Sequence, residues 1–195
     1  MGKKALLIEL FFRSLCPPFF SFSKIEAICR DKLSKKPKDI NVLWILSNLY
    51  IHDKKYDEAR HYLEKLSEMN KNTKSVKLLL SKVYYNLKNY NKVKEILENG
   101  EVLSLEDSEH YYLGDSLVEL KEFNSAAEHL SIYLRFHKEK YVPFVRIGYS
   151  YYMQGLFDNA LEAYRKAAEL NPNSIEIEES IVLCANKIRN GKAFH

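Results

Sequence analysis

The stretch FDNALEAY, residues 157–164, has three earlier counterparts in the chain, namely YDEARHYL (56–63), YNKVKEIL (90–97) and FNSAAEHL (123–130). The aromatic residues that open these stretches lie 34, 33 and 34 residues apart. Each is followed by Asp or Asn, and two places later by Ala or, in one stretch, by Val. A period of this length predicts a stack of helical hairpins rather than a globule built around a catalytic pocket.

Small residues recur in each period where the two helices of a hairpin would cross. In the first helix, a large apolar residue and a small one are followed three places on by another large residue: Leu46-Ser47 with Tyr50, Leu80-Ser81 with Tyr84, Leu113-Gly114 with Leu117, and Ile147-Gly148 with Tyr151. In the second helix, a small residue precedes a large one by four places: Ala59 with Leu63, Val93 with Leu97, Ala126 with Leu130, and Ala160 with Tyr164. Such spacing gives each helix one apolar face, and the small side chains let two helices approach closely.

These positions resemble the motif of the tetratricopeptide repeat family, and the fourth period also closes with Asn171-Pro172, a helix stop of the family's type. The resemblance implies an all-α, right-handed α-α superhelix of four repeats, with a partial helical pair before them and a capping helix after them. We expect the repeats within residues 40–173, at 40–73, 74–106, 107–140 and 141–173.

The two ends of the chain are expected to cover the repeats. The segments are an apolar N-terminal stretch (1–22), a capping or partial-repeat helix (23–39), a C-terminal capping helix (174–190) and a tail (191–195). Ser23 and Glu26 have the spacing of a capping box, and Pro37 ends the helix that it would open.

Two further expectations concern helix ends. Residues that recur just before each expected second helix are predicted to cap its free backbone N–H groups with a side-chain oxygen: Asp57, Asn91, Asn124 and Asp158. Asn99-Gly100 predicts an early helix stop, and we expect a hinge between the second and third repeats there.

The composition narrows the class of partner. The net charge is +4, but residues 1–39 hold nine Lys and Arg against four Asp and Glu, so the rest of the chain is nearly neutral. A neutral repeat body argues against a nucleic-acid-binding solenoid, which needs a basic stripe. Cys16, Cys29 and Cys184 form no CxxC motif and are odd in number, which favours a reducing compartment over a disulfide framework.

The apolar run ALLIELFFRSLC, residues 5–16, allows three interpretations. It can pair with helix 23–35 to complete a degenerate repeat. It can lie in a membrane interface, so peripheral membrane contact through residues 3–22 stays open. It can also fill the groove of its own or a neighbouring copy, so self-association stays open too.

The first helices of the repeats are expected to line a concave wall. In the family's register the wall positions include a large share of apolar and aromatic residues, and in the third and fourth repeats they also include Asp115, Val118, Glu119, Val142 and Met153. Tyr and Trp suit a protein interface, because each has a large flat surface with one polar tip. The residues predicted to bind a partner are Trp44, Asn48, Leu78, Lys82, Tyr85, Tyr111, Tyr112, Arg146, Tyr149 and Tyr152. Asn48 and Arg146 match only part of the family's carboxylate clamp, so binding of a chaperone's C-terminal tail is not expected.

We find no pattern for catalysis. The sequence has no Gly-rich phosphate loop, no GxSxG and no HExxH, and its six histidines show no convincing metal-ligand spacing. We therefore expect a cytoplasmic non-enzyme without catalytic residues, cofactor or metal, which binds a mainly apolar peptide, helix or domain of another protein and no nucleic acid. By resemblance it is similar to small adaptor, assembly-factor and secretion-chaperone members of the family. The alternative is a membrane-surface or self-assembling scaffold whose groove is filled in cis or by a neighbouring copy.

Overall fold

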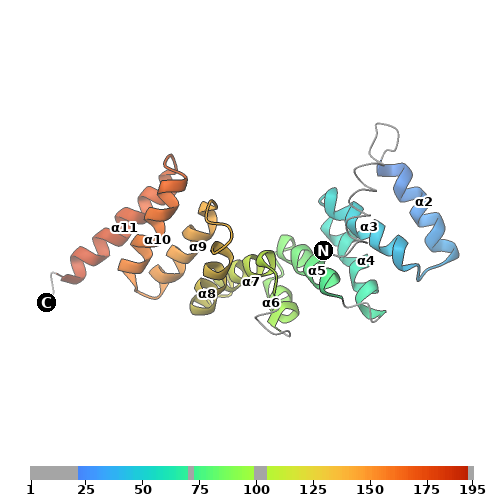
Figure 1. The fold of residues 1–195 in the computed structure, drawn as a ribbon, viewed down its shortest axis with the longest axis horizontal. Coiled ribbons are helices and arrows are strands. Elements are labelled where there is room, and N and C mark those ends of the chain that lie inside the picture. Colours follow the sequence, from blue (N-terminus) through green and yellow to red (C-terminus); the bar gives the residue numbers. More distant parts are fainter. Residues whose placement is uncertain (1–21, 70–72, 99–104, 193–195) are drawn as a thin grey trace. The chain divides into compact units, whose positions relative to one another are not determined.

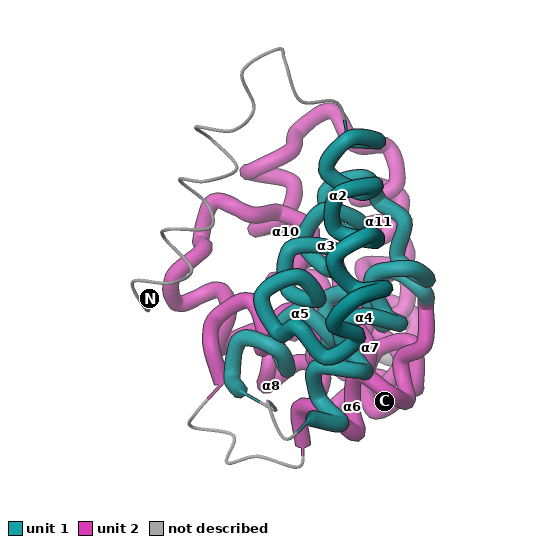
Figure 2. The backbone as a smooth tube through the Cα atoms, turned by 90° about the vertical axis from the view of Figure 1, so that its right-hand side faces the viewer, with its two compact units in different colours: residues 1–87 teal, residues 88–195 magenta. Residues whose placement is uncertain are grey.

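The computed structural model describes residues 22–69, 73–98 and 105–192, and the regular secondary structure in these ranges is helical throughout (Figure 1). The helices fall into two compact units, residues 1–87 and residues 88–195, which Figure 2 colours separately. Asn99 and Gly100, where a hinge was predicted, lie outside the described residues, as does most of the apolar N-terminal segment.

In residues 1–87, each described helix packs against the next one along the chain. The helices are α2 (Phe22–Lys35), α3 (Ile40–His52), α4 (Tyr56–Glu68) and α5 (Lys74–Asn86). Tyr50 of α3 is 2% exposed, and its ring stacks on Tyr62 of α4 with ring centroids 5.6 Å apart. Its hydroxyl donates to Glu26 Oε1 of α2 at 2.6 Å, so this one residue ties three helices together.

In residues 88–195, packing is again sequential, and α7 also contacts α9 across α8. The helices are α6 (Tyr90–Glu98), α7 (Asp107–Glu119), α8 (Phe123–Leu134), α9 (Tyr141–Met153), α10 (Phe157–Leu170) and α11 (Ile175–Lys192). The predicted all-α fold of sequentially packed helical pairs is confirmed within the described residues.

The small residues predicted at the helix crossings are buried in both units. Ser47 and Ser81 hold these positions in residues 1–87, and Gly114 and Gly148 hold them in residues 88–195. A Cβ atom added to Gly148 would lie 2.9 Å from ring atoms of Tyr164, which leaves no room for a methyl group. The glycine is therefore required by the close approach of α9 to α10.

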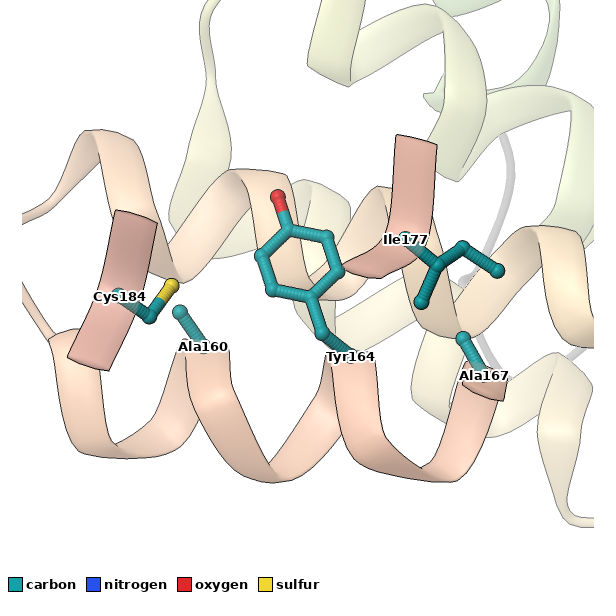
Figure 3. Packing of buried hydrophobic residues seen from close by; sticks show 5 residues of the cluster. All are labelled: Ala160, Tyr164, Ala167, Ile177 and Cys184. Carbon is teal, nitrogen blue, oxygen red and sulfur yellow. The ribbon is translucent and has the colours of Figure 1, made fainter. Parts of the chain in front are cut away.

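Tyr164 belongs to the core between α10 and α11. Figure 3 shows its ring between Cys184 and Ile177 of α11, with Ala160 and Ala167 on its own helix. All five residues are at most 4% exposed. The side of α11 that holds Ile177 and Cys184 thus packs against α10.

The turns between the paired helices contain a feature that the sequence analysis missed. Lys54, Lys88 and Lys121 have φ of 58°, 58° and 63°, and Gly155 has φ of 76°. These residues recur with the period of the repeat, and each lies two places before the aromatic residue that starts the next helix. At Lys121 the following N–H, of Glu122, donates to Leu117 O at 2.9 Å, which is the six-residue closure of a Schellman motif.

The predicted N-caps are wrong. Helices α4, α8 and α10 already begin at the aromatic residue, so Asp57, Asn124 and Asp158 lie inside the first turn. The N-cap residues there make no side-chain cap hydrogen bond. In α6 it is Asn89, not Asn91, whose side-chain oxygen accepts from Lys92 N at 3.3 Å. The aromatic residue fixes the helix start by packing, and the acidic residues beside it favour the positive end of the helix.

The capping box expected at Ser23 also differs from the structure. Helix α2 already includes Phe22, and the carboxylate of Glu26 binds Arg30 Nε at 2.8 Å as well as the Tyr50 hydroxyl. Among the described residues, no helix is both long enough and apolar enough to cross a membrane.

Candidate partner-binding surface

Helix α9 turns one side to its neighbours and the other to solvent. Pro143, Ile147, Gly148 and Ser150 are buried. On the other side Val142, Tyr149 and Met153 are 39%, 41% and 48% exposed, and Arg146 lies between them. The spacing of four, three and four residues places these four side chains in one line along the helix. We call Val142, Arg146, Tyr149 and Met153 the α9 face.

Arg146 is bound by two carboxylates of α7. Its Nε donates to Asp115 Oδ1 and one terminal nitrogen donates to Glu119 Oε1, while the same nitrogen lies 3.4 Å from Asp115 O. Burial by itself lowers the pKa of Arg146, but the hydrogen bond to Glu119 and the charge of Asp115 outweigh it, and the pKa rises. The guanidinium is thus held in place and charged.

Arg146, Asp115 and Glu119 form a charged cluster, and its two carboxylates differ in exposure. The side chain of Asp115 is 10% exposed, that of Arg146 is 24% exposed and that of Glu119 is 40% exposed. Burial raises the pKa of Tyr90, the first residue of α6, and the negative charges of Glu119 and Asp115 raise it further. The cluster therefore has a buried end at Asp115 and an open end at Glu119.

Two aromatic pairs join α9 to the helices on either side of it. Tyr149 meets Phe123, the first residue of α8, edge to face with ring centroids 6.0 Å apart. Tyr152 meets Phe157 in the same manner at 5.4 Å and packs partly on the core of α10 and α11. Tyr149 is thus the ring of this group that is most available to a partner.

The other residues predicted to bind a partner in residues 88–195 are more enclosed. Tyr111 and Tyr112 are half-buried on α7 and meet edge to face at 5.9 Å. Tyr111 also contacts Tyr133 of α8 at 5.2 Å, so part of its surface serves the packing of α7 on α8. The predicted wall positions Asp115 and Val118 are buried, at 7% and 3% exposed, because α7 is covered on more sides than the repeat register implied.

In residues 1–87, the predicted residues lie on α3 and α5. Trp44, Asn48, Leu78, Lys82 and Tyr85 are all half-buried. The side-chain amide of Asn48 donates to Trp44 O at 2.9 Å, one turn back in the same helix. This bond occupies one donor of the amide and leaves its oxygen to other groups.

Four residues on or beside the α9 face were not among the predicted binding residues. Val142, Met153 and Glu119 occupied wall positions in the sequence and were passed over in favour of tyrosines. Phe123 gave no signal, because it opens a second helix and looks like a packing residue of the repeat motif.

His110 and His129 form a buried pair between α7 and α8. Their Nδ1 atoms lie 2.9 Å apart, and burial lowers the pKa of both imidazoles. Within residues 22–69, 73–98 and 105–192, no group of three or more His, Cys, Asp and Glu side chains is placed to hold a metal ion. The two buried rings lie with centroids 5.1 Å apart and so contribute to the packing of α7 on α8.

Two family models match the chain. Residues 143–174 match the tetratricopeptide repeat model, and residues 52–132 match a model described as anaphase-promoting complex, cyclosome, subunit 3. The first match covers α9 and α10, the hairpin that presents the α9 face. The resemblance to the tetratricopeptide repeat family that the sequence predicted is confirmed at residues 143–174.

Several solved structures share the fold. A crystal structure of MamA is 22% identical, with 76% of this chain and 81% of that chain covered and a TM-score of 0.68. A MamA fragment from Desulfovibrio magneticus RS-1 is 17% identical, with 77% and 92% covered and a TM-score of 0.64. YrrB, described as a tetratricopeptide repeat protein with an unusual peptide-binding site, is 17% identical, with 81% and 84% covered and a TM-score of 0.71. At these identities the likeness concerns the fold alone.

Proposed function

We propose that this chain is a protein-interaction adaptor, whose α9 face binds a mainly apolar peptide, helix or domain of another protein. The observation that supports this most is the exposure of Val142, Tyr149 and Met153 in one line on a helix whose opposite side is buried. Each apolar anchor of a partner that is buried there gains roughly 1.5–3 kcal/mol. Ordering of the partner offsets much of this gain, so we expect a dissociation constant on the order of micromolar.

The remaining predicted residues extend this proposal. In residues 88–195 we extend the proposed surface to Tyr111, Tyr112 and Tyr152. In residues 1–87 a second proposed surface consists of Trp44, Asn48, Leu78, Lys82 and Tyr85. The YrrB structure supports the proposal to the extent that a protein of this fold is described as having a peptide-binding site.

The proposal includes no catalytic step and no cofactor. The matching fold is that of an interaction protein, and the α9 face offers no nucleophile beside a general base. We place the protein in the cytoplasm, because Cys29 and Cys184 are free buried thiols and form no disulfide with each other. A chaperone-like role is a narrower form of the same proposal.

Affinity capture from native lysate tests the proposal. The full chain is compared with a Tyr149→Ala/Met153→Ala variant, and captured proteins are quantified by mass spectrometry. The matched control is Val182→Ala/Leu183→Ala, which removes similar apolar area from α11, where both side chains are more than half exposed. We expect the α9 variant to lose its captured protein and the α11 variant to keep it. Equal capture by all three chains would reject the α9 face as the binding surface.

A second candidate is self-assembly, and one observation favours it. Ile175, Val182 and Leu183 are exposed on the outer side of α11, away from the buried Ile177 and Cys184. Light scattering over a range of concentrations, with and without anionic vesicles, tests this candidate and the membrane alternative together. A mass that rises with concentration and falls back in Val182→Ser/Leu183→Ser supports self-assembly, and a constant monomer mass that vesicles do not change rejects both.

A further inference from the structure

Helix α7, the first helix of a repeat in residues 88–195, is acidic. Helix α7 contains Asp107, Glu109, Asp115 and Glu119 and no Lys or Arg. Helix α9 contains one charged residue, Arg146. Glu109 is 2% exposed and Asp107 lies near His137 of the turn after α8, so the carboxylates beside Arg146, the cation of α9, are those of Asp115 and Glu119.

That cation is already neutralised. Arg146 is bound by both Asp115 and Glu119, so the three groups together have a net charge of −1. A partner's carboxylate that approached Arg146 would come equally close to the carboxylates of Asp115 and Glu119. Their repulsion would cancel the attraction of the guanidinium. Arg146 therefore serves as a support for Glu119 rather than as a clamp for an acidic ligand.

Glu119 is placed to receive a cation. Its side chain is the most exposed of the three, and Arg146 contacts it from one side. Tyr149 follows Arg146 by three residues on the α9 face, and Phe123 of α8 meets its exposed ring. A Lys or Arg side chain can thus pair with Glu119 while its stem covers Tyr149, where the face of the ring also attracts a cation.

We infer that the partner segment bound on the α9 face has a Lys or Arg side chain among its apolar anchors, and that this cation pairs with Glu119. The inference rests on the proposed function and names the chemistry of the partner. Charge complementarity favours this occupant over a second copy of the α9 face, since two such surfaces would bring two negative clusters together. A preference for a cation also distinguishes the α9 face from a surface that selects a C-terminal carboxylate.

A peptide library tests the inference with the full chain. Short random peptides with amidated C-termini are selected on the immobilised protein, and a parallel library has free C-termini. Selection is repeated with Glu119→Gln and with the matched control Glu169→Gln, an exposed glutamate of α10. The best amidated peptide is then titrated by fluorescence anisotropy, and a copy with norleucine in place of its Lys is titrated beside it.

We expect enrichment of Lys and Arg in the selected peptides and no preference for a free C-terminus. The Glu119→Gln variant should bind the selected peptide about three- to fivefold more weakly than the unmodified chain does. The variant and the unmodified chain should bind the norleucine copy with equal affinity. Glu169→Gln should change neither. Thermal unfolding of Glu119→Gln shows whether the variant folds, and a shift in peptide preference is a readout that loss of folding does not produce.

The outcomes separate the inference from the function on which it rests. Peptides that bind, depend on Tyr149 and show no Lys or Arg preference overturn the inference and leave the proposed function standing. Enrichment of acidic residues or free carboxylates overturns it in the same way. A failure of Tyr149→Ala to reduce binding of any selected peptide overturns both.

Discussion

The two units of this chain build the same kind of helical pair in different ways. In residues 1–87 the crossing positions hold Ser47 and Ser81, and the Ser47 hydroxyl donates to Leu43 O at 2.8 Å within its own helix. In residues 88–195 they hold Gly114 and Gly148, and a Cβ there would lie 2.8 Å from Leu130 and 2.9 Å from Tyr164. The repeat motif requires only a small residue, and the facing side chain decides how small it must be.

The units also differ in the charge of their first helices. Helices α3 and α5 have three lysines and no acidic residue, whereas α7 and α9 have four acidic residues and one arginine. The packing positions are shared by both units, so this difference lies in residues that the fold leaves free to vary. Such positions are where we expect partner chemistry to be encoded.

The largest stability effect is expected at Gly148. Gly148→Ala should lower the free energy of unfolding by about 1–2 kcal/mol, because the overpacking cost of up to about 3 kcal/mol exceeds the gain in helix propensity of about 1 kcal/mol. Gly114→Ala should cost about as much, because its Cβ would lie 2.8 Å from Leu130 Cγ and 3.1 Å from the backbone nitrogen of Leu130. Urea unfolding followed by circular dichroism measures both. A stabilised Gly148→Ala would mean that α9 and α10 are less closely packed than described.

An alkaline shift tests the network around Tyr50. Burial, followed by the bond to Glu26, raises the pKa of Tyr50 to about 12. The native state therefore holds this proton more tightly than the unfolded chain, where the phenol titrates near 10. The stability is complete below pH 10 and is lost as pH rises toward 12, by about 1 kcal/mol at pH 11. Between pH 9 and pH 11, the free energy of unfolding of Tyr50→Phe should fall by about 1 kcal/mol less than that of the unmodified chain. Equal losses in the two proteins would contradict the raised pKa of Tyr50.

The turns offer a comparison within residues 88–195. Lys121→Gly should raise the free energy of unfolding by up to about 1 kcal/mol, because φ of 63° strains a residue with a Cβ. Gly155→Ala should lower it by a similar amount, and the cause is the backbone alone, since no atom lies within 4 Å of the added Cβ. Differential scanning calorimetry on both variants would show midpoint changes of opposite sign. Changes of the same sign would reject the backbone explanation.

The smallest effect is expected at the serine crossing. Ser47→Ala should change the free energy of unfolding by no more than about 0.5 kcal/mol, because the lost hydroxyl bond is local and Ala favours the helix. The difference between the stability losses of Gly148→Ala and Ser47→Ala shows how much more closely the helices pack at the glycine crossing than at the serine crossing. A loss as large as that at Gly148 would remove the contrast between the two units.

The sequence predicted the fold well because packing residues recur with a constant period. Leu46, Ala59, Leu113 and Ala160 are each fully buried, as their motif positions imply. The helix starts were less predictable, since Asp57 and its counterparts look like caps, yet the preceding aromatic residue joins the helix. The lysines at positive φ were missed because turn signals are sought in Gly and Asn, and here the surrounding helices impose the conformation.

The candidate site was predictable only in part. Spacing placed Tyr149 on the wall of the repeats, and the structure leaves it exposed on α9. The pairing of Arg146 with Asp115 and Glu119 joins residues about thirty positions apart, and no local pattern reports such a contact. The chemistry of the surface depends on that contact, because it turns an apparent anion site into one that favours a cation.

Hydrogen–deuterium exchange tests the binding surface most directly. The full chain is measured alone and with the tightest amidated peptide from the library selection. We predict slower exchange in Tyr141–Met153 and Asp107–Glu119, where the peptide covers α9 and α7, with little change in α11. Slower exchange confined to Ile175–Lys192, with α7 and α9 unchanged, would contradict the account and place the partner on the capping helix.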